Sequence, residues 1–67
     1  MKIEDRLINI IKQETNKKVT IESMDLITSK FYMIIDENGE LKQNIELYGD
    51  DYSDEELKHE INFKLLI

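Results

Sequence analysis

The stretch that decides the fold is FYMIIDENGELKQNIEL, residues 31–47. Its two ends are rich in the branched and aromatic residues that strands favour, and its centre, residues 36–40, reads DENGE. We therefore predict two antiparallel strands joined by a tight hairpin. A three-residue loop with a type I turn and a bulge at Gly39 pairs Asp36 with Glu40.

This loop sets the register of the hairpin, because side chains along a strand alternate between two faces. The predicted pairs are Ile35 with Leu41, Met33 with Gln43, and Phe31 with Ile45. We expect the apolar side chains of one face to be buried: Phe31, Met33, Ile35, Leu41, Ile45 and Leu47. The opposite face is mostly polar and carries Tyr32, Ile34, Lys42, Asn44, Glu46 and Tyr48.

Upstream of the hairpin, residues 3–15 have the apolar spacing of an amphipathic helix. The stripe consists of Ile3, Leu7, Ile10, Ile11 and Glu14. Asn16 then suits the left-handed conformation that commonly ends a helix. We predict a helix that ends at Thr15.

A strand is expected to follow at about residues 18–27. Val19 and Ile21 share one parity, whereas the apolar residues after them have the opposite parity. A regular strand cannot change parity, so we expect a bulge near Glu22 and Ser23. The alternative is a strand that is buried on both faces near its end.

Downstream of the hairpin, residues 52–57 read YSDEEL. Ser53 and Glu56 have the spacing of a capping box, and the apolar residues on either side have that of a hydrophobic staple. From Leu57 onward apolar residues recur at helical spacing, which favours a helix to the end of the chain. Residues 61–67 also alternate as in a strand, and this alternative stays open.

The expected order of elements is α–β–β–β–α in a single domain, residues 1–67. The predicted fold class is α+β, with a three-stranded antiparallel meander packed against two helices. The chain has no cysteine and no long apolar run, so we expect a cytoplasmic protein without disulfides or a membrane span.

Charge is distributed unevenly along the chain. Residues 1–35 carry six basic and five acidic residues, a net charge of +1, whereas residues 36–67 carry three basic and ten acidic residues, a net charge of −7. Direct binding to nucleic acid is not expected, because contacts to phosphate need cations. A basic protein surface is the natural partner of the acidic half.

The acidic residues of this half are the candidate partner-binding site. They are expected at the hairpin tip, on one strand, in the following loop and in the first helical turn: Asp36, Glu37, Glu40, Glu46, Asp50, Asp51, Asp54 and Glu55. Helix capping and the helix dipole explain part of YGDDYSDEE, residues 48–56. They do not explain Asp50 and Asp51, which are therefore the more specific candidates.

Residues for catalysis or metal binding are sparse. His59 is the only histidine, and its Glu-x-x-His spacing with Glu56 occurs once, where a bundle site needs more ligands. The aspartates after residue 49 do not match a calcium-binding loop. No serine has an identifiable base, and no glycine-rich phosphate loop is present. We predict a protein without enzymatic activity, metal or cofactor.

Two stretches resemble the phage uracil-DNA glycosylase inhibitor family. IIKQETNKKVTIES, residues 10–23, is similar to its N-terminal helix and first strand, at Ile10, Ile11, Glu14, Thr15, Lys17, Ile21, Glu22 and Ser23. YMIIDENGELK, residues 32–42, is similar to its final hairpin, whereas the family's middle helix and strands have no counterpart. Members of that family are acidic DNA mimics whose Glu-Ser strand enters the DNA-binding cleft of the glycosylase. The resemblance implies a partner-binding role for Glu22 and Ser23.

These observations predict a small acidic inhibitor, encoded by a phage, that acts as a DNA mimic. It would block the basic nucleic-acid-binding surface of a host enzyme, either a uracil-DNA glycosylase or a CRISPR or other defence nuclease. One alternative is a self-associating structural or regulatory module, for example a homodimer, because a meander leaves two open edges. Another is an immunity-type partner of a basic toxin.

Overall fold

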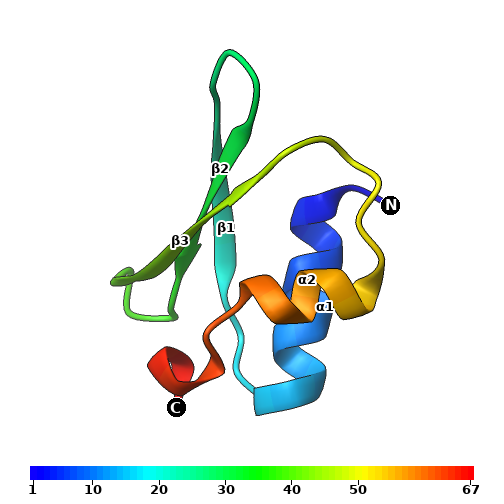
Figure 1. Ribbon diagram of the computed structural model, residues 1–67. Coiled ribbons are helices and arrows are strands. Elements are labelled where there is room, and N and C mark those ends of the chain that lie inside the picture. The colour runs from blue at the N-terminus through cyan, green and yellow to red at the C-terminus, as the bar shows by residue number, and fades with distance from the viewer.

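The computed structural model describes residues 1–67 and confirms the α+β meander (Figure 1). The elements, in order, are α1 (Ile3–Thr15), β1 (Thr20–Asp25), β2 (Lys30–Ile35), β3 (Leu41–Leu47), α2 (Asp54–Glu60) and the short 3-10 helix η1 (Phe63–Leu66). The strands form one antiparallel sheet in the order β1-β2-β3. None of the helices combines the length and the hydrophobicity needed to cross a lipid bilayer.

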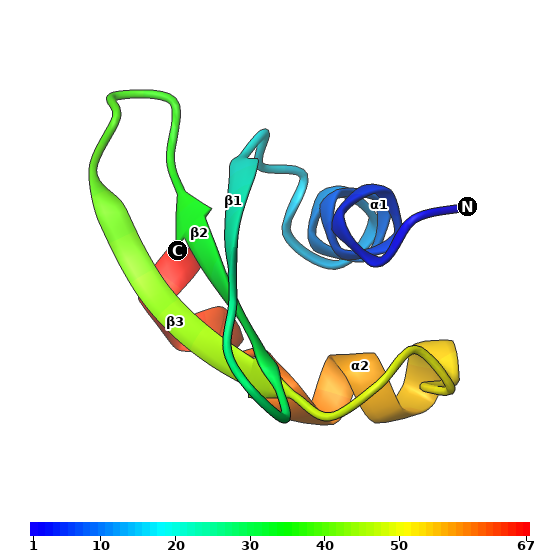
Figure 2. The same ribbon diagram turned by 90° about the horizontal axis from the view of Figure 1, so that it is seen from above.

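Both α-helices lie on the same face of the sheet, and its other face is uncovered (Figure 2). We call the covered face the inner face and the uncovered face the outer face. The core between the layers consists of apolar residues and one tyrosine, and no charged side chain is buried in it. Its members are Ile3, Leu7, Ile10, Ile11, Val19, Tyr32, Ile34, Ile45, Leu47, Leu57, Ile61 and Leu66.

Helix α1 has the predicted bounds. Its apolar stripe is buried, and Asn16 ends it in the left-handed conformation with a φ of 60°. Glu14, which belongs to the same stripe, is exposed, and its carboxylate lies 3.5 Å from the Lys58 ammonium of α2. The stripe therefore identifies the buried face correctly except at its last, charged position.

The tip of the β2–β3 hairpin also has the predicted structure. The N–H of Asp36 donates to the carbonyl of Glu40 at 3.0 Å, and the N–H of Gly39 donates to the carbonyl of Asp36 at 3.1 Å. Gly39 has a φ of 81°, which glycine adopts without the steric cost of a Cβ. Ile35 lies opposite Leu41.

Beyond this pair the predicted register is wrong, because β3 contains one extra residue. Ile34 lies opposite Gln43, so Lys42 has no partner on β2 and forms a bulge. The later pairs are Met33 with Asn44, Tyr32 with Ile45, Phe31 with Glu46, and Lys30 with Leu47. Because β3 has one extra residue, each face of β3 beyond the bulge lies alongside the opposite face of β2 from the one predicted.

The bulge decides which side chains are buried. Tyr32 and Ile34 are 2% and 0% exposed, although the predicted register placed them on the polar face. Ile45 and Leu47 are buried as expected. The prediction is wrong for the four apolar residues that lie on the outer face: Phe31, Met33, Ile35 and Leu41.

Strand β1 is shorter than predicted and has no bulge. Glu22 pairs with Met33 and Ser23 with Tyr32 in an unbroken register, so the expected irregularity is absent. The alternative, burial on both faces, also fails, because Met24 is 51% exposed. The change in parity is real, but it places Met24 on the outer face, where nothing covers it.

The C-terminal segment is neither one long helix nor a strand. The capping box starts α2, which ends at Glu60 because Ile61 is extended. The Gln43 side chain then fixes the chain to β3, since its amide donates to the Asn62 carbonyl and accepts from the Asn62 N–H, both at 2.9 Å. This contact directs η1 back toward the core and buries Leu66, while Leu65 remains exposed.

Candidate functional site

The acidic loop, residues 48–56, comprises the connection from β3 to α2 together with the first turn of α2, and it is held by Arg6 of α1. The Arg6 guanidinium donates to the Asp54 carboxylate at 2.7 and 3.1 Å, and to the Tyr52 carbonyl at 2.8 Å. One arginine therefore binds a charged and a backbone acceptor at once, which its planar fork allows. The loop is fixed to α1 by these three hydrogen bonds.

Contacts within the loop add to this order. The Tyr52 hydroxyl accepts from the N–H of Tyr48 at 3.0 Å. Ser53 and Glu56 form the complete capping box, at 2.8 and 3.1 Å. Gly49 has a φ of 91°, so a side chain at this position would strain the turn. The acidic loop thus has a defined conformation.

Asp50 and Asp51 are the charges that this framework presents to solvent. Both are exposed, and neither has a lysine or arginine nitrogen within 4.0 Å. Asp54 and Glu55 follow on α2, where they pair with Arg6 and Lys58 respectively. Their side chains still keep 64% and 80% of their surface exposed, so these four carboxylates face solvent together.

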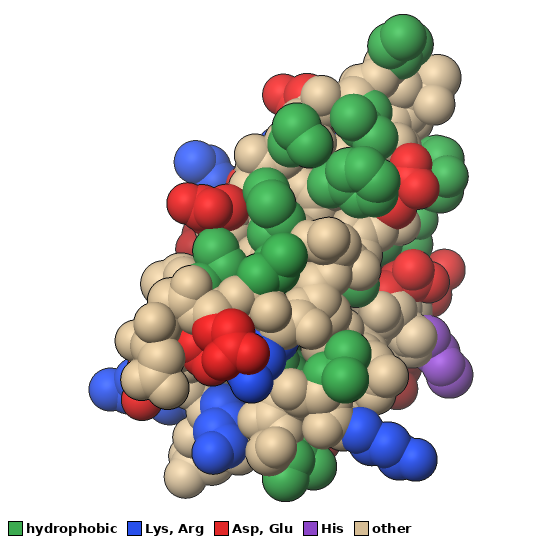
Figure 3. Space-filling view, turned by 90° about the vertical axis from the view of Figure 1, so that its left-hand side faces the viewer, with side chains coloured by type: hydrophobic (Ala, Val, Ile, Leu, Met, Phe, Trp, Pro, Cys, Tyr) green, Lys and Arg blue, Asp and Glu red, His purple; other side chains and the backbone are tan.

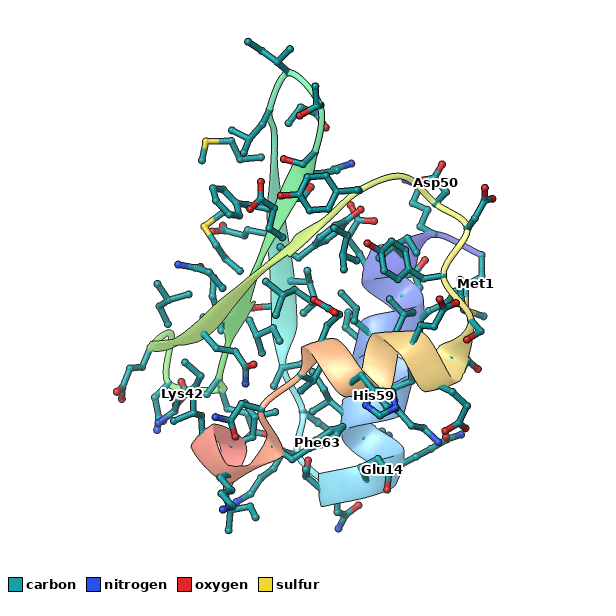
Figure 4. All side chains as sticks on the ribbon, in the orientation of Figure 1. Met1, Glu14, Lys42, Asp50, His59 and Phe63 are labelled. Atoms are coloured by element: carbon teal, nitrogen blue, oxygen red, sulfur yellow. The ribbon has the colours of Figure 1, made fainter.

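The acidic residues do not form a single connected surface. Lys42 beside the hairpin tip and Asp50 in the acidic loop lie at opposite ends of the sheet (Figure 4). The hairpin tip and the acidic loop lie at either end of β3, whose seven residues span roughly 20 Å. Asp36, Glu37 and Glu40 thus form one group and the acidic loop another. Glu46 lies between the groups, where Ser29 donates to it at 2.6 Å.

At the hairpin tip the aspartate has a structural task. The Asp36 carboxylate accepts the N–H groups of Asn38 and Glu40, both at 2.9 Å, and lies 3.6 Å from the Lys42 ammonium. Glu40 shares that ammonium at 3.7 Å. Glu37 is exposed and forms neither a hydrogen bond nor an ion pair through its side chain. The tip therefore contributes less free negative charge than its sequence suggests.

The structure places Glu22 and Ser23 on opposite faces of β1. Glu22 is exposed on the outer face beside Met33. Ser23 is directed to the helix side, and its hydroxyl donates to the Glu4 carboxylate at 3.2 Å. A flat partner surface cannot contact both side chains from one side of the sheet.

The outer face is a feature that sequence reasoning missed. Apolar side chains gather over the sheet on this side of the molecule (Figure 3). Three rows of paired residues cross it: Thr20, Ile35 and Leu41; Glu22, Met33 and Asn44; Met24, Phe31 and Glu46. Met24 and Leu41 are 51% and 50% exposed. The sequence of β2 has apolar residues at both odd and even positions, and only the bulge determines which of them lie on the uncovered face.

Little in the structure resembles a catalytic or metal centre. A hollow of about 330 Å³ beside Asp50 is lined by side chains of both signs, including Lys2, Glu4, Arg6 and Lys30. No three histidine or carboxylate side chains are grouped so that they could hold a metal ion.

Comparisons of the chain with protein-family models, with curated proteins and with solved structures found no match.

Two carboxylates link stability to pH. The backbone N–H of Glu40 donates to the Asp36 carboxylate, and the backbone N–H of Ser53 donates to the Glu56 carboxylate. Each hydrogen bond lowers the pKa of the carboxyl group that accepts it from its ordinary value. The stabilisation is present above the unfolded-state pKa values and is lost as pH falls through the folded-state ones. We expect the urea midpoint to fall as pH drops below about 4.

The double variant Asp36→Asn, Glu56→Gln should make this acid-side slope shallower. Glu37→Gln is the control, because Glu37 accepts no such hydrogen bond. An unchanged slope in the double variant would contradict the assignment.

Proposed function

We propose that this protein is a non-catalytic acidic inhibitor that binds a basic protein surface in the cytoplasm and keeps nucleic acid from it. One observation carries the proposal: the acidic loop is held in one conformation by Arg6 and its own cap, and it presents Asp50 and Asp51 unpaired. A fixed array of carboxylates loses little entropy when it meets a complementary array of lysines and arginines.

The proposed mechanism is steric competition that long-range attraction accelerates. The net charge of −6 and the exposed carboxylates of the acidic loop favour fast association with a basic surface. Such a complex should weaken as salt is added, because exposed charges are screened within about 10 Å at 0.1 M salt. Nucleic acid and the inhibitor would then compete for the same lysines and arginines.

The likeness of residues 10–23 and 32–42 to phage uracil-DNA glycosylase inhibitors suggests the first target to assay. Purified uracil-DNA glycosylase should lose activity on uracil-containing DNA when the protein is added. A CRISPR nuclease or another defence nuclease is the next target. The experiment that covers all of them is capture from host lysate on immobilised protein at low salt, followed by mass spectrometry and a DNA-competition assay with the captured enzyme.

Neutralising the two free aspartates should weaken the captured complex. Asp50→Asn with Asp51→Asn is expected to slow association about fivefold at low salt, with a smaller effect at high salt. Biolayer interferometry against the captured enzyme measures the rate. The control is Glu37→Gln with Glu40→Gln, which removes the same charge from the opposite end of the sheet.

Equal decreases in the association rate of the two double variants would show that the net charge of the protein drives association, and not the acidic loop. Failure to retain any nucleic-acid-binding protein at low salt would overturn the proposed function itself.

A further inference from the structure

We propose that two copies of the chain associate through the outer faces of their sheets, around a two-fold axis roughly parallel to β2. This surface is separate from the acidic loop, so the inference does not rest on the proposed function. It assigns a second copy of the chain as the occupant of the uncovered face.

The outer face exposes a group of apolar side chains. Phe31, Met33 and Ile35 run along its central strand and are partly exposed, with Met24 and Leu41 more exposed beside them. Scattered apolar residues are normal on a surface, but a contiguous group on one sheet face marks a contact site. A sheet covered on one side only can bury its other face by packing against a second sheet.

The placement of charge on the outer face selects the symmetry of the dimer. The paired rows of the outer face contain two carboxylates, Glu22 and Glu46, and no lysine or arginine. A two-fold axis across the strands would put Glu22 against Glu22 of the other copy, and like charges in contact are costly. An axis along β2 avoids this, because it places β1 of one copy over β3 of the other.

The register gives the contacts of the favoured arrangement. Glu22 meets Asn44 of the other copy, Glu46 meets Met24, and Leu41 meets Thr20. The central residues Phe31, Met33 and Ile35 lie on the axis and meet their own counterparts. Glu46 is already hydrogen-bonded to Ser29 at 2.6 Å, so it needs no partner across the interface. In this orientation no carboxylate of one copy faces a carboxylate of the other.

The area of the outer face sets the expected affinity of the dimer. Three strands and six residues along each cover roughly 14 by 20 Å, which is small for a stable interface. We expect a dimer that forms in the micromolar range. Each copy carries a charge of −6, so added salt should strengthen it by screening the repulsion. This dependence is opposite in sign to that of a complex with a basic partner.

Sedimentation equilibrium of the full chain tests the proposal. Between roughly 10 µM and 1 mM protein, the mass should rise from 8.0 kDa to about twice that value, more steeply in high salt. Leu41→Lys should weaken the dimer at least tenfold by placing a charge in the interface. Leu65→Lys is the matched control, because Leu65 has nearly the same exposure, 48% against 50%, but lies on η1. Circular dichroism verifies that both variants are folded.

Asn44→Lys tests the axis. With the axis along β2, the introduced ammonium faces Glu22 of the other copy, and the dimer should tighten several-fold. With the axis across the strands, two introduced ammoniums face each other, and the dimer should weaken. A monomer at all concentrations, equal effects of Leu41→Lys and Leu65→Lys, or weakening or no change by Asn44→Lys would each overturn the arrangement.

Discussion

Replacing Ile34 by alanine should destabilise the fold by about 3 kcal/mol, within the range of roughly 2–5 kcal/mol for truncating a buried isoleucine. Ile34 is 0% exposed, lies near the end of the central strand β2 and faces the helices. A domain this small is expected to have a total stability of only about 5 kcal/mol. The variant should therefore keep only about 2 kcal/mol of stability and unfold at a much lower urea concentration than the native protein. Urea denaturation followed by circular dichroism, in dilute protein, measures the loss.

Met33→Ala is the matched control, because it truncates the neighbouring residue on the outer face. Met33 is partly exposed there, so its truncation should cost less than about 1 kcal/mol. The order of the two effects tests the register of the hairpin. A regular hairpin without the bulge would bury Met33 and expose Ile34, and would reverse the order.

The sequence predicts those parts of the fold that depend on local chemistry. The bounds of α1 follow from its apolar stripe and from Asn16, whose left-handed conformation ends the helix. The start of α2 follows from Ser53 and Glu56, and the hairpin tip from Gly39. Each of these features needs only residues within a few positions of one another, so the sequence shows them directly.

The register of the sheet could not be predicted in the same way. Strand β2 reads KFYMII, which is apolar at almost every position and suits either face equally. The choice is made by β3, where the bulge at Lys42 turns Ile45 and Leu47 inward. Lys42 gains two carboxylates at that bulge, at 3.6 and 3.7 Å, and nothing in the alternation of residues indicates them.

The candidate site was predictable in composition but not in arrangement. The sequence identifies Asp50 and Asp51 as acidic residues that capping does not explain, and the structure places both at the surface. It does not show that Arg6 binds the acidic loop, because the two contacts join residues 46 and 48 positions apart. It also does not show the outer face, because the predicted register assigned those residues to the core.

The contact between Arg6 and the acidic loop should have the second-largest effect. Arg6→Ala is expected to cost about 2 kcal/mol, because it leaves the Tyr52 carbonyl and the Asp54 carboxylate without their donor. The exposed half of the contact contributes the smaller share, since the Asp54 side chain is 64% exposed and water competes for it. Urea denaturation of the folded variant measures the total.

Two further variants separate the two halves of this contact. Arg6→Lys keeps the charge but loses the planar fork, so it should recover only part of the stability. In an Asp54→Ala background, Arg6→Ala should still cost roughly 1 kcal/mol, which reports the bond to the Tyr52 carbonyl. No remaining cost in that background would mean that the ion pair alone holds the acidic loop.

The same variant connects the fold to the proposed function. Without Arg6, the N–H groups of Tyr48 and Ser53, which are hydrogen-bonded within the acidic loop, should exchange with solvent deuterium faster than in the native protein, while those of β2 change only with global stability. A complex that depends on a preformed array of carboxylates should then dissociate faster, because the loop would have to become ordered when it binds. If the loop loosens and the captured complex is unaffected, the carboxylates act through their charge alone, and the conformation of the loop is irrelevant to binding.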